Sequence, residues 1–226
     1  MSPPIRLAVF DCDGTLVDSQ HSIITAVHAA FDAQGLNRPD DEAIRRGVGL
    51  PLLAAMVRLA PDQSDAVHEN LRSGYSDAWQ ELRRQGALDD PLYPGAVDAL
   101  NALRDGGWLL GVATGKSHRG LVDTLELHGV SDMFVTLQTS DRALGKPNPD
   151  MLHKAMAETG ADAQDTVMIG DTTFDMEMAV NAQTPAIGVA WGYHAVEELI
   201  ASGAGVVVRD YPELAPLLSE IGEVVQ

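Results

Sequence analysis

Val9-Phe10-Asp11-Cys12-Asp13-Gly14-Thr15 is an apolar segment that ends on two carboxylates one residue apart. The apolar residues before it, between Ile5 and Phe10, are typical of a parallel strand covered on both faces. Residues i and i+2 of a strand point to the same side, so we expect Asp11 and Asp13 to share one mouth, with Cys12 buried behind them. This mouth lies at the strand's C-terminal end, where open α/β sheets bind ligands.

Two carboxylates this close repel one another, and one of them takes up a proton unless a cation lies between them. A divalent ion with oxygen ligands, above all Mg²⁺, is the natural cation. A plain turn is the alternative, because Asp and Gly are frequent turn residues. The stretch alone leaves both interpretations open.

Composition narrows the class of protein. Thirty-three acidic and fifteen basic side chains give a formal net charge of -18, which argues against nucleic acid or an anionic membrane as the main partner. The single cysteine excludes an internal disulfide framework and a multi-cysteine zinc site. The sequence has no recognisable signal peptide and no apolar segment of membrane-spanning length, so we expect a cytoplasmic protein. Its sequence leaves monomer and homodimer open.

The pattern of apolar residues divides the chain into two parts. Residues 18–88 read as helices throughout, near 19–33, 41–46, 52–59 and 63–84, and a stretch with two prolines and a glycine ends them. From residue 96 onward helices alternate with short apolar runs at 108–113, 133–137, 166–169, 186–190 and 205–208. This alternation predicts an α/β fold with a doubly wound parallel sheet. We expect a catalytic core of residues 1–17 and 89–226, with residues 18–88 inserted as a helical domain.

Three later strand ends carry polar residues that could serve a phosphate site. Thr114-Gly115-Lys116 precedes a helix start, which suits a phosphate, although Thr114 or Ser117 could simply cap that helix. Lys146 lies in a stiff loop between a glycine and a proline, where a solvated surface lysine is the alternative. Asp171 follows the next strand, and Asp175 can face the same mouth if a helix begins between them.

Taken in order, these signals resemble the haloacid dehalogenase superfamily. Its four motifs correspond to Asp11 to Thr15 in D-x-D-G-T, Thr114 as the second-motif Ser/Thr, Lys146 in G-K-P-x-P, and Gly170 to Asp175 in G-D-x-x-x-D. The resemblance spans nearly the whole chain. A helical module after the first strand is similar to the subfamily with an α-helical cap, and within it to phosphoglycolate phosphatase-type enzymes.

The resemblance implies a Mg²⁺-dependent phosphatase with an aspartyl-phosphate intermediate. Asp11 is then the nucleophile and Asp13 the general acid and base, with Lys146 and Thr114 as the other catalytic residues. The implied metal site uses Asp11, Asp171, the Asp13 main-chain carbonyl, and Asp175 through the metal's water shell. The residues expected to bind substrate are Gly115, Lys116 and Arg46.

Relatives of the superfamily offer other activities. Asp13 argues against a dehalogenase, which lacks that acid/base residue, and a cap without lysine argues against phosphonate hydrolysis. A β-phosphoglucomutase-type isomerase shares all four motifs but carries a basic residue where this chain has Leu50. A regulatory protein with a vestigial site remains the non-enzymatic alternative.

The substrate is the least determined property. The loop from Gly47 to Pro51, with Arg45 and Arg46, is expected to close over the mouth. The resemblance suggests a small phosphorylated carboxylate such as phosphoglycolate, whose carboxylate Arg46 would bind. His118 is a further candidate for substrate contact. These remain expectations drawn from the sequence.

Overall fold

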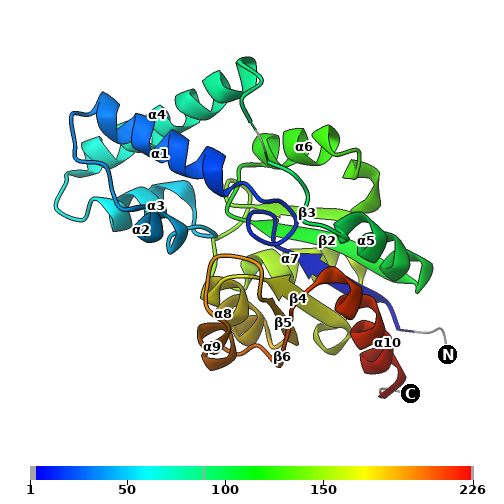
Figure 1. Cartoon of the computed structure of the whole chain (residues 1–226). Helices are drawn as coiled ribbons and strands as arrows, with labels where there is room; N and C mark the ends of the chain where they lie inside the picture. Colours follow the sequence, from blue (N-terminus) through cyan, green and yellow to red (C-terminus); the bar gives the residue numbers. More distant parts are fainter. Residues whose placement is uncertain (1–3, 89, 225–226) are drawn as a thin grey trace.

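The fold is described from a computed structural model that covers residues 4–88 and 90–224. Six strands form one parallel sheet in the order β3-β2-β1-β4-β5-β6 (Figure 1). The strands are β1 Arg6–Phe10, β2 Trp108–Thr114, β3 Thr136–Thr139, β4 Thr166–Gly170, β5 Ala186–Val189 and β6 Val206–Val208. The predicted doubly wound α/β fold is confirmed. The strand order reverses between β1 and β4, which is where such sheets bind ligands.

Helices cover both faces of the sheet. The bounds are α5 Ala96–Asp105, α6 His118–Leu127, α7 Asp150–Thr159, α8 Thr173–Ala182, α9 Val196–Ala201 and α10 Leu214–Val224, with short 3₁₀ turns at Ser131–Met133, Ala163–Asp165 and Tyr211–Glu213. Residues of α5, α6 and α10 share one apolar cluster, and those of α7, α8 and α9 share another. The sheet is therefore buried on both sides.

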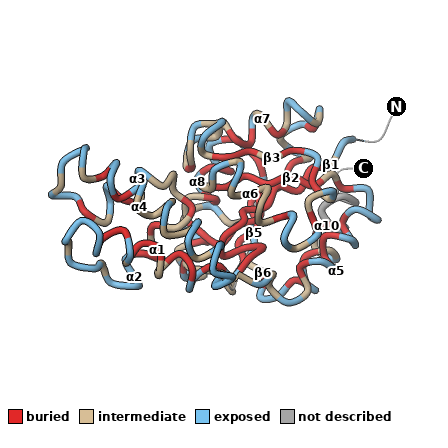
Figure 2. The backbone as a smooth tube through the Cα atoms, turned by 90° about the horizontal axis from the view of Figure 1, so that it is seen from above, coloured by how far each residue is buried: buried red, intermediate tan, exposed pale blue. Residues whose placement is uncertain are grey.

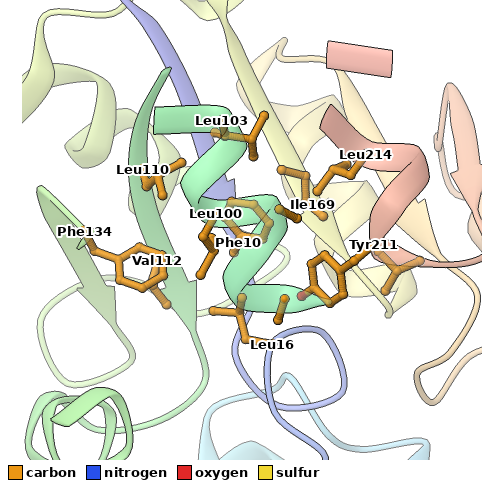
Figure 3. Close-up of a cluster of buried hydrophobic side chains, with 14 of the residues drawn as sticks. Phe10, Leu16, Leu100, Leu103, Leu110, Val112, Phe134, Ile169, Tyr211 and Leu214 are labelled. Carbon is orange, nitrogen blue, oxygen red and sulfur yellow. The ribbon is translucent and has the colours of Figure 1, made fainter. Parts of the chain in front are cut away.

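Strand β1 shows how the sequence builds this double burial. Ala8 and Phe10 lie in the first cluster, whereas Leu7 and Val9 lie in the second, as the alternation of a strand requires. Figure 3 shows Phe10 packed among side chains of the neighbouring strands and of the covering helices. Cys12 is fully buried in the first cluster, as predicted, and burial raises the pKa of its thiol. A buried, protonated thiol is a poor nucleophile.

The helices inserted after β1 form a body with its own core. They are α1 Gln20–Ala33, α2 Asp41–Arg45, α3 Leu52–Leu59 and α4 Asp65–Arg84. Helix α1 packs along α4, and Ile23, Val27, Phe31 and Leu71 belong to the insert's apolar cluster. Figures 1 and 2 show this insert beside the sheet, with most of its outer surface exposed. We refer to α1–α4 as the helical insert.

The boundaries of the predicted domains, at residues 17/18 and 88/89, stay a prediction. Residues 1–3, 89 and 225–226 of the predicted core lie outside the described part of the chain. Across the described residues, the longest and most apolar helices still fall short of what crossing a membrane requires.

One strand prediction is wrong in its bounds. The apolar run at 133–137 predicts a strand, but Met133 ends a 3₁₀ turn and the strand is Thr136–Thr139. Phe134 fills the core from the loop, and the strand continues through buried polar residues, Gln138 and Thr139. The apolar run therefore marked neither the strand nor its burial fully, since Val135 is exposed.

Candidate active site

The ends of β1 and β4 bring the first and last motifs together. The Asp11 N–H donates to the Ile169 carbonyl oxygen over 2.9 Å, which ties the two strand ends side by side. Asp11, Asp171 and Asp175 each place a carboxylate oxygen within 4.8 Å of the others, and all three are buried. The predicted convergence of these carboxylates is therefore present in the structure.

Lys146 lies between two of these carboxylates. Its Nζ is 2.8 Å from Asp11 Oδ1 and 2.6 Å from Asp175 Oδ1, and its side chain is fully buried. Burial opposes the charged form, but Asp11 and Asp175 outweigh it and raise the pKa of Lys146 above its ordinary value. The alternative of a solvated surface lysine is wrong.

Local contacts fix the orientation of the other two carboxylates. Thr172 caps α8, and its N–H and hydroxyl both donate to Asp175 Oδ2, over 3.1 and 2.6 Å. Asp171 accepts from the Thr15 hydroxyl over 2.8 Å and from the Tyr193 N–H over 2.9 Å. Tyr193 belongs to the stretch from Gly188 to Tyr193 that is similar to phosphoglycolate phosphatase-type enzymes, but it acts here through its main-chain N–H, which its side-chain type does not reveal. Thr15 stands inside the first motif, which was the available signal for it.

The charges at this site fit a divalent cation. Burial raises the pKa of Asp11 to about 7 despite Lys146, and burial together with Asp11 and Asp175 raises the pKa of Asp171 well above its ordinary value. The raised pKa values mean that burial and mutual repulsion disfavour the anionic forms of these carboxyls, and a bound cation would favour them. Asp11 Oδ2 is buried without a hydrogen-bond partner. An oxygen donor set with one free, buried carboxylate oxygen suits a hard ion such as Mg²⁺.

Asp13 has a different set of partners. Lys116 Nζ lies 2.8 Å from Asp13 Oδ1, which also accepts from the Ser19 hydroxyl over 2.5 Å. The same ammonium stands over the ring of Trp79 in α4, 4.7 Å from the ring centroid. Burial opposes the charged form of Lys116, but Asp13 outweighs it and raises its pKa. Lys116 thus connects the end of β2 with the helical insert.

The loop after β2 meets the helical insert directly. Thr114 is buried, and its hydroxyl accepts from the Lys116 N–H over 3.2 Å. A Cβ on Gly115 would lie 2.6 Å from the Leu50 carbonyl oxygen and 2.9 Å from that of Gly49. Only glycine permits this approach. The insert's loop therefore lies against the predicted phosphate-binding turn.

Three further residues have structural contacts of their own. The Ser117 hydroxyl caps α6 by accepting from Gly120, so the capping interpretation is confirmed for Ser117. The His118 N–H donates to Asp141 over 2.9 Å. Arg46 forms a bidentate ion pair with Glu198 of α9, one bond being 2.6 Å long. The structure thus engages Arg46 in a contact between the insert and the core, and its binding to substrate stays a prediction.

Comparisons with known proteins agree with this geometry. A family model described as haloacid dehalogenase-like hydrolase matches residues 8–189. The probable phosphatase IndB of Dickeya dadantii (strain 3937) is 36% identical over 214 residues, 92% of this chain and 91% of the relative. The phosphoglycolate phosphatase of Agrobacterium fabrum (strain C58 / ATCC 33970) is 29% identical over 220 residues, 96% of this chain and 94% of the relative.

Solved structures show the same similarity. The crystal structure of a predicted phosphatase from Clostridium acetobutylicum matches with a TM-score of 0.85 at 26% identity, covering 96% of this chain and 99% of that one. A hydrolase from Pseudomonas syringae matches with a TM-score of 0.84 at 27% identity, with the same coverage.

Proposed function

The chain belongs to the haloacid dehalogenase-like hydrolase family, and from this premise we propose that it is a Mg²⁺-dependent phosphatase of a small phosphorylated metabolite. One observation carries the proposal. The Lys146 ammonium contacts Asp11 and Asp175 in a buried cluster that Asp171 completes. Such a cluster combines a nucleophile, a cation that stabilises developing charge, and oxygen ligands for a metal.

In the first half-reaction, a carboxylate oxygen of Asp11 attacks phosphorus and the bond from phosphorus to the ester oxygen breaks. Asp13 donates its proton to that departing oxygen, which leaves as an alcohol. The Thr114 hydroxyl and the Gly115 N–H hold phosphoryl oxygens, and Lys146 offsets the repulsion between the anionic nucleophile and the anionic substrate. The product on the enzyme is an aspartyl phosphate.

In the second half-reaction, Asp13 takes a proton from water, and the water oxygen attacks the phosphorus of the aspartyl phosphate. The bond between phosphorus and the Asp11 oxygen breaks, which frees inorganic phosphate and restores the carboxylate. Asp13 thus returns to its protonated form. The loop at Gly49 and Leu50, which lies against Gly115, keeps other water molecules out.

Asp11, Asp171 and the main-chain carbonyl of Asp13 would hold the Mg²⁺, with Asp175 acting through a water molecule because Lys146 and Thr172 already occupy its oxygens. When bound, the ion supplies positive charge to the phosphoryl oxygens.

A phosphomutase is the second candidate, since it would use the same four motifs. Leu50 disfavours it, because the insert loop offers an apolar side chain where such mutases carry a basic residue. A phosphatase releases inorganic phosphate, whereas a mutase returns an isomeric phosphate ester. Product analysis by ³¹P NMR separates the two.

The test is hydrolysis of p-nitrophenyl phosphate with Mg²⁺ and with EDTA. We expect turnover only with Mg²⁺, and a fall of roughly 10³-fold or more in Asp11→Asn with an unchanged circular dichroism spectrum. Asp18→Asn, which alters an exposed carboxylate after the same strand, is the control. Full activity of Asp11→Asn, after mass spectrometry excludes deamidation, would falsify the assignment of Asp11.

A further inference from the structure

The side chain of Asp171 is held by a loop that lies outside the four motifs. This loop, Trp191-Gly192-Tyr193, follows β5 at the same edge of the sheet, and we refer to it as the β5 loop. The Tyr193 N–H donates to Asp171 Oδ2 over 2.9 Å. A Cβ on Gly192 would overlap the Asp171 side chain. The β5 loop therefore packs directly on one member of the buried carboxylate cluster.

The other oxygen of Asp171 is held through Thr15. The Thr15 hydroxyl donates to Asp171 Oδ1 over 2.8 Å. The carbonyl oxygen of Thr15 in turn accepts from two aromatic side chains, the Trp191 indole N–H over 3.0 Å and the Tyr211 hydroxyl over 2.8 Å. A carbonyl oxygen has two lone pairs, so these two donors use both of them. They fix the residue whose hydroxyl orients Asp171.

Trp191 and Tyr211 also pack on each other, with ring centroids 4.7 Å apart. Tyr211 is 1% exposed, and Figure 3 shows it among the buried side chains of the core. A buried hydroxyl is costly unless it is hydrogen-bonded, and phenylalanine would fill much the same space without one. Apolar packing alone therefore does not account for the hydroxyl that Tyr211 directs at Thr15.

These contacts restrict the orientation of a metal ligand. Each oxygen of Asp171 accepts one hydrogen bond, so the carboxylate is held facing Asp11 and Asp175, with which it forms the buried cluster. A ligand that is oriented in advance loses less freedom when an ion binds, and the residues that orient it raise the affinity without touching the ion.

We propose that Trp191 and Tyr211 are positioning residues for the metal ligand Asp171, which they hold in its metal-binding orientation through Thr15. The inference rests on the metal site of the proposed function and adds to it two residues from outside the four motifs. Tyr211 comes from the 3₁₀ turn after β6, so the last part of the chain supports the first motif.

The test measures Mn²⁺ binding without substrate, from the electron paramagnetic resonance signal of the free ion, because Mn²⁺ takes the same oxygen ligands as Mg²⁺. Tyr211→Phe and Trp191→Phe each remove one donor and keep an aromatic ring, so the Kd for Mn²⁺ should rise roughly threefold or more in each. Thr15→Val removes the hydroxyl and keeps the side-chain shape, and should raise the Kd roughly tenfold or more. Tyr93→Phe removes the hydroxyl of a second tyrosine that packs on Trp191, and as the control it should stay within about twofold.

A double-mutant cycle separates positioning from a general effect on the fold. If Tyr211 acts through Thr15, adding Tyr211→Phe to Thr15→Val should change the Kd by less than about twofold, because the bond to Asp171 is already lost. Equal weakening by Tyr211→Phe in both backgrounds overturns the proposal. An unchanged Kd in both Tyr211→Phe and Trp191→Phe also overturns it, as does an equal rise in Tyr93→Phe.

Circular dichroism spectra report whether each variant folds, and Trp191→Phe replaces Tyr211→Phe in the cycle if the latter does not. The outcome also distinguishes this inference from the proposed function. A wild-type protein that binds no Mn²⁺ would overturn the proposed metal site, and the positioning role with it. Wild-type binding that Tyr211→Phe and Trp191→Phe leave unchanged would overturn the positioning role alone.

Discussion

The two lysines of the site, Lys146 and Lys116, stand in contrasting surroundings. Lys146 is fully buried, and both of its carboxylate partners follow strands of the core sheet or lie in the helix after them. Lys116 pairs with one core carboxylate and packs on Trp79 of the helical insert. The ion pairs of both lysines thus lie within the core, and of these contacts only that of Lys116 with Trp79 joins core and insert. The lysine with two carboxylate partners therefore lies inside the core, and the lysine with one carboxylate partner lies where the core meets the insert.

The largest effect on activity and stability should follow from breaking the buried ion pairs of Lys146 with Asp11 and Asp175. Lys146→Met leaves Asp11 and Asp175 without their cation, so kcat/KM should fall roughly 10²–10³-fold or more. The free energy of unfolding should fall by about 3–5 kcal/mol, because breaking a buried pair strands a charge. Steady-state kinetics and urea unfolding measure both quantities.

Lys154→Met is the matched control, since Lys154 is exposed and pairs with Asp150 within one helix. Its effect on either quantity should be small. Equal losses in the two variants would contradict the special position of Lys146.

Metal binding should sharpen the contrast further, because the cluster of carboxylate ligands found among the described residues, Asp11, Asp171 and Asp175, lies beside Lys146. Saturating Mg²⁺, at about 100 times its Kd, should stabilise the wild-type fold by about 2.7 kcal/mol. For a chain of this size, that corresponds to a rise in Tm of about 5–10 °C. Asp171→Asn should abolish most of the rise. The same rise in wild type and variant, measured by calorimetry at constant ionic strength, would place the metal elsewhere.

A smaller effect on kcat/KM is expected at the contact between the helical insert and the core. Trp79→Leu removes the ring beneath the Lys116 ammonium, so kcat/KM should fall by about two- to thirtyfold, mainly through KM. Trp79→Phe keeps an aromatic face and should lose less. Gln80→Ala, at the exposed neighbouring position, serves as the control. Unchanged kinetics in Trp79→Leu would show that the insert's contact with Lys116 has no bearing on substrate binding.

The smallest effect concerns Arg46 and Glu198, the exposed contact between insert and core. The hydrogen bonds from Arg46 lower the pKa of Glu198 to about 2. A depressed carboxyl pKa stabilises the fold above the ordinary pKa, and this contribution is lost as pH falls toward 2. In Arg46→Ala, NMR titration should show the Glu198 carboxyl returning toward its ordinary range.

Turnover by Arg46→Ala should change by less than about threefold, because exposed ion pairs contribute little. A loss of roughly tenfold or more that is confined to carboxylate-bearing substrates would restore the sequence-based interpretation of Arg46 as a substrate ligand.

Local sequence patterns were enough to predict that Asp11, Asp171 and Asp175 lie close together. Asp11 and Asp171 each end an apolar run, and the carboxyl ends of parallel strands meet at one edge of a sheet. Asp175 follows Asp171 by about one helical turn, so a helix beginning at Thr173 suffices to place it. Each prediction needed only strand alternation, helix periodicity and the direction of the strands.

The contacts between the helical insert and the core could not be predicted from such local patterns. Trp79 of α4 and Lys116 of the loop after β2 are distant in the chain, and no periodicity relates them. Arg46 is an example, because nothing in the sequence indicates its ion pair with Glu198, far along the chain. The bounds of β3 failed for a related reason, since Phe134 is buried by packing from a loop.

By itself, the sequence determined the fold class, the insertion after β1 and the residues that converge at the strand ends, because these depend on short-range pattern and on the geometry of parallel sheets. Tertiary structure alone decided which lysine pairs with which carboxylate and that Arg46 pairs with Glu198. Those outcomes depend on how the helical insert meets the core, and that contact joins residues distant in the chain.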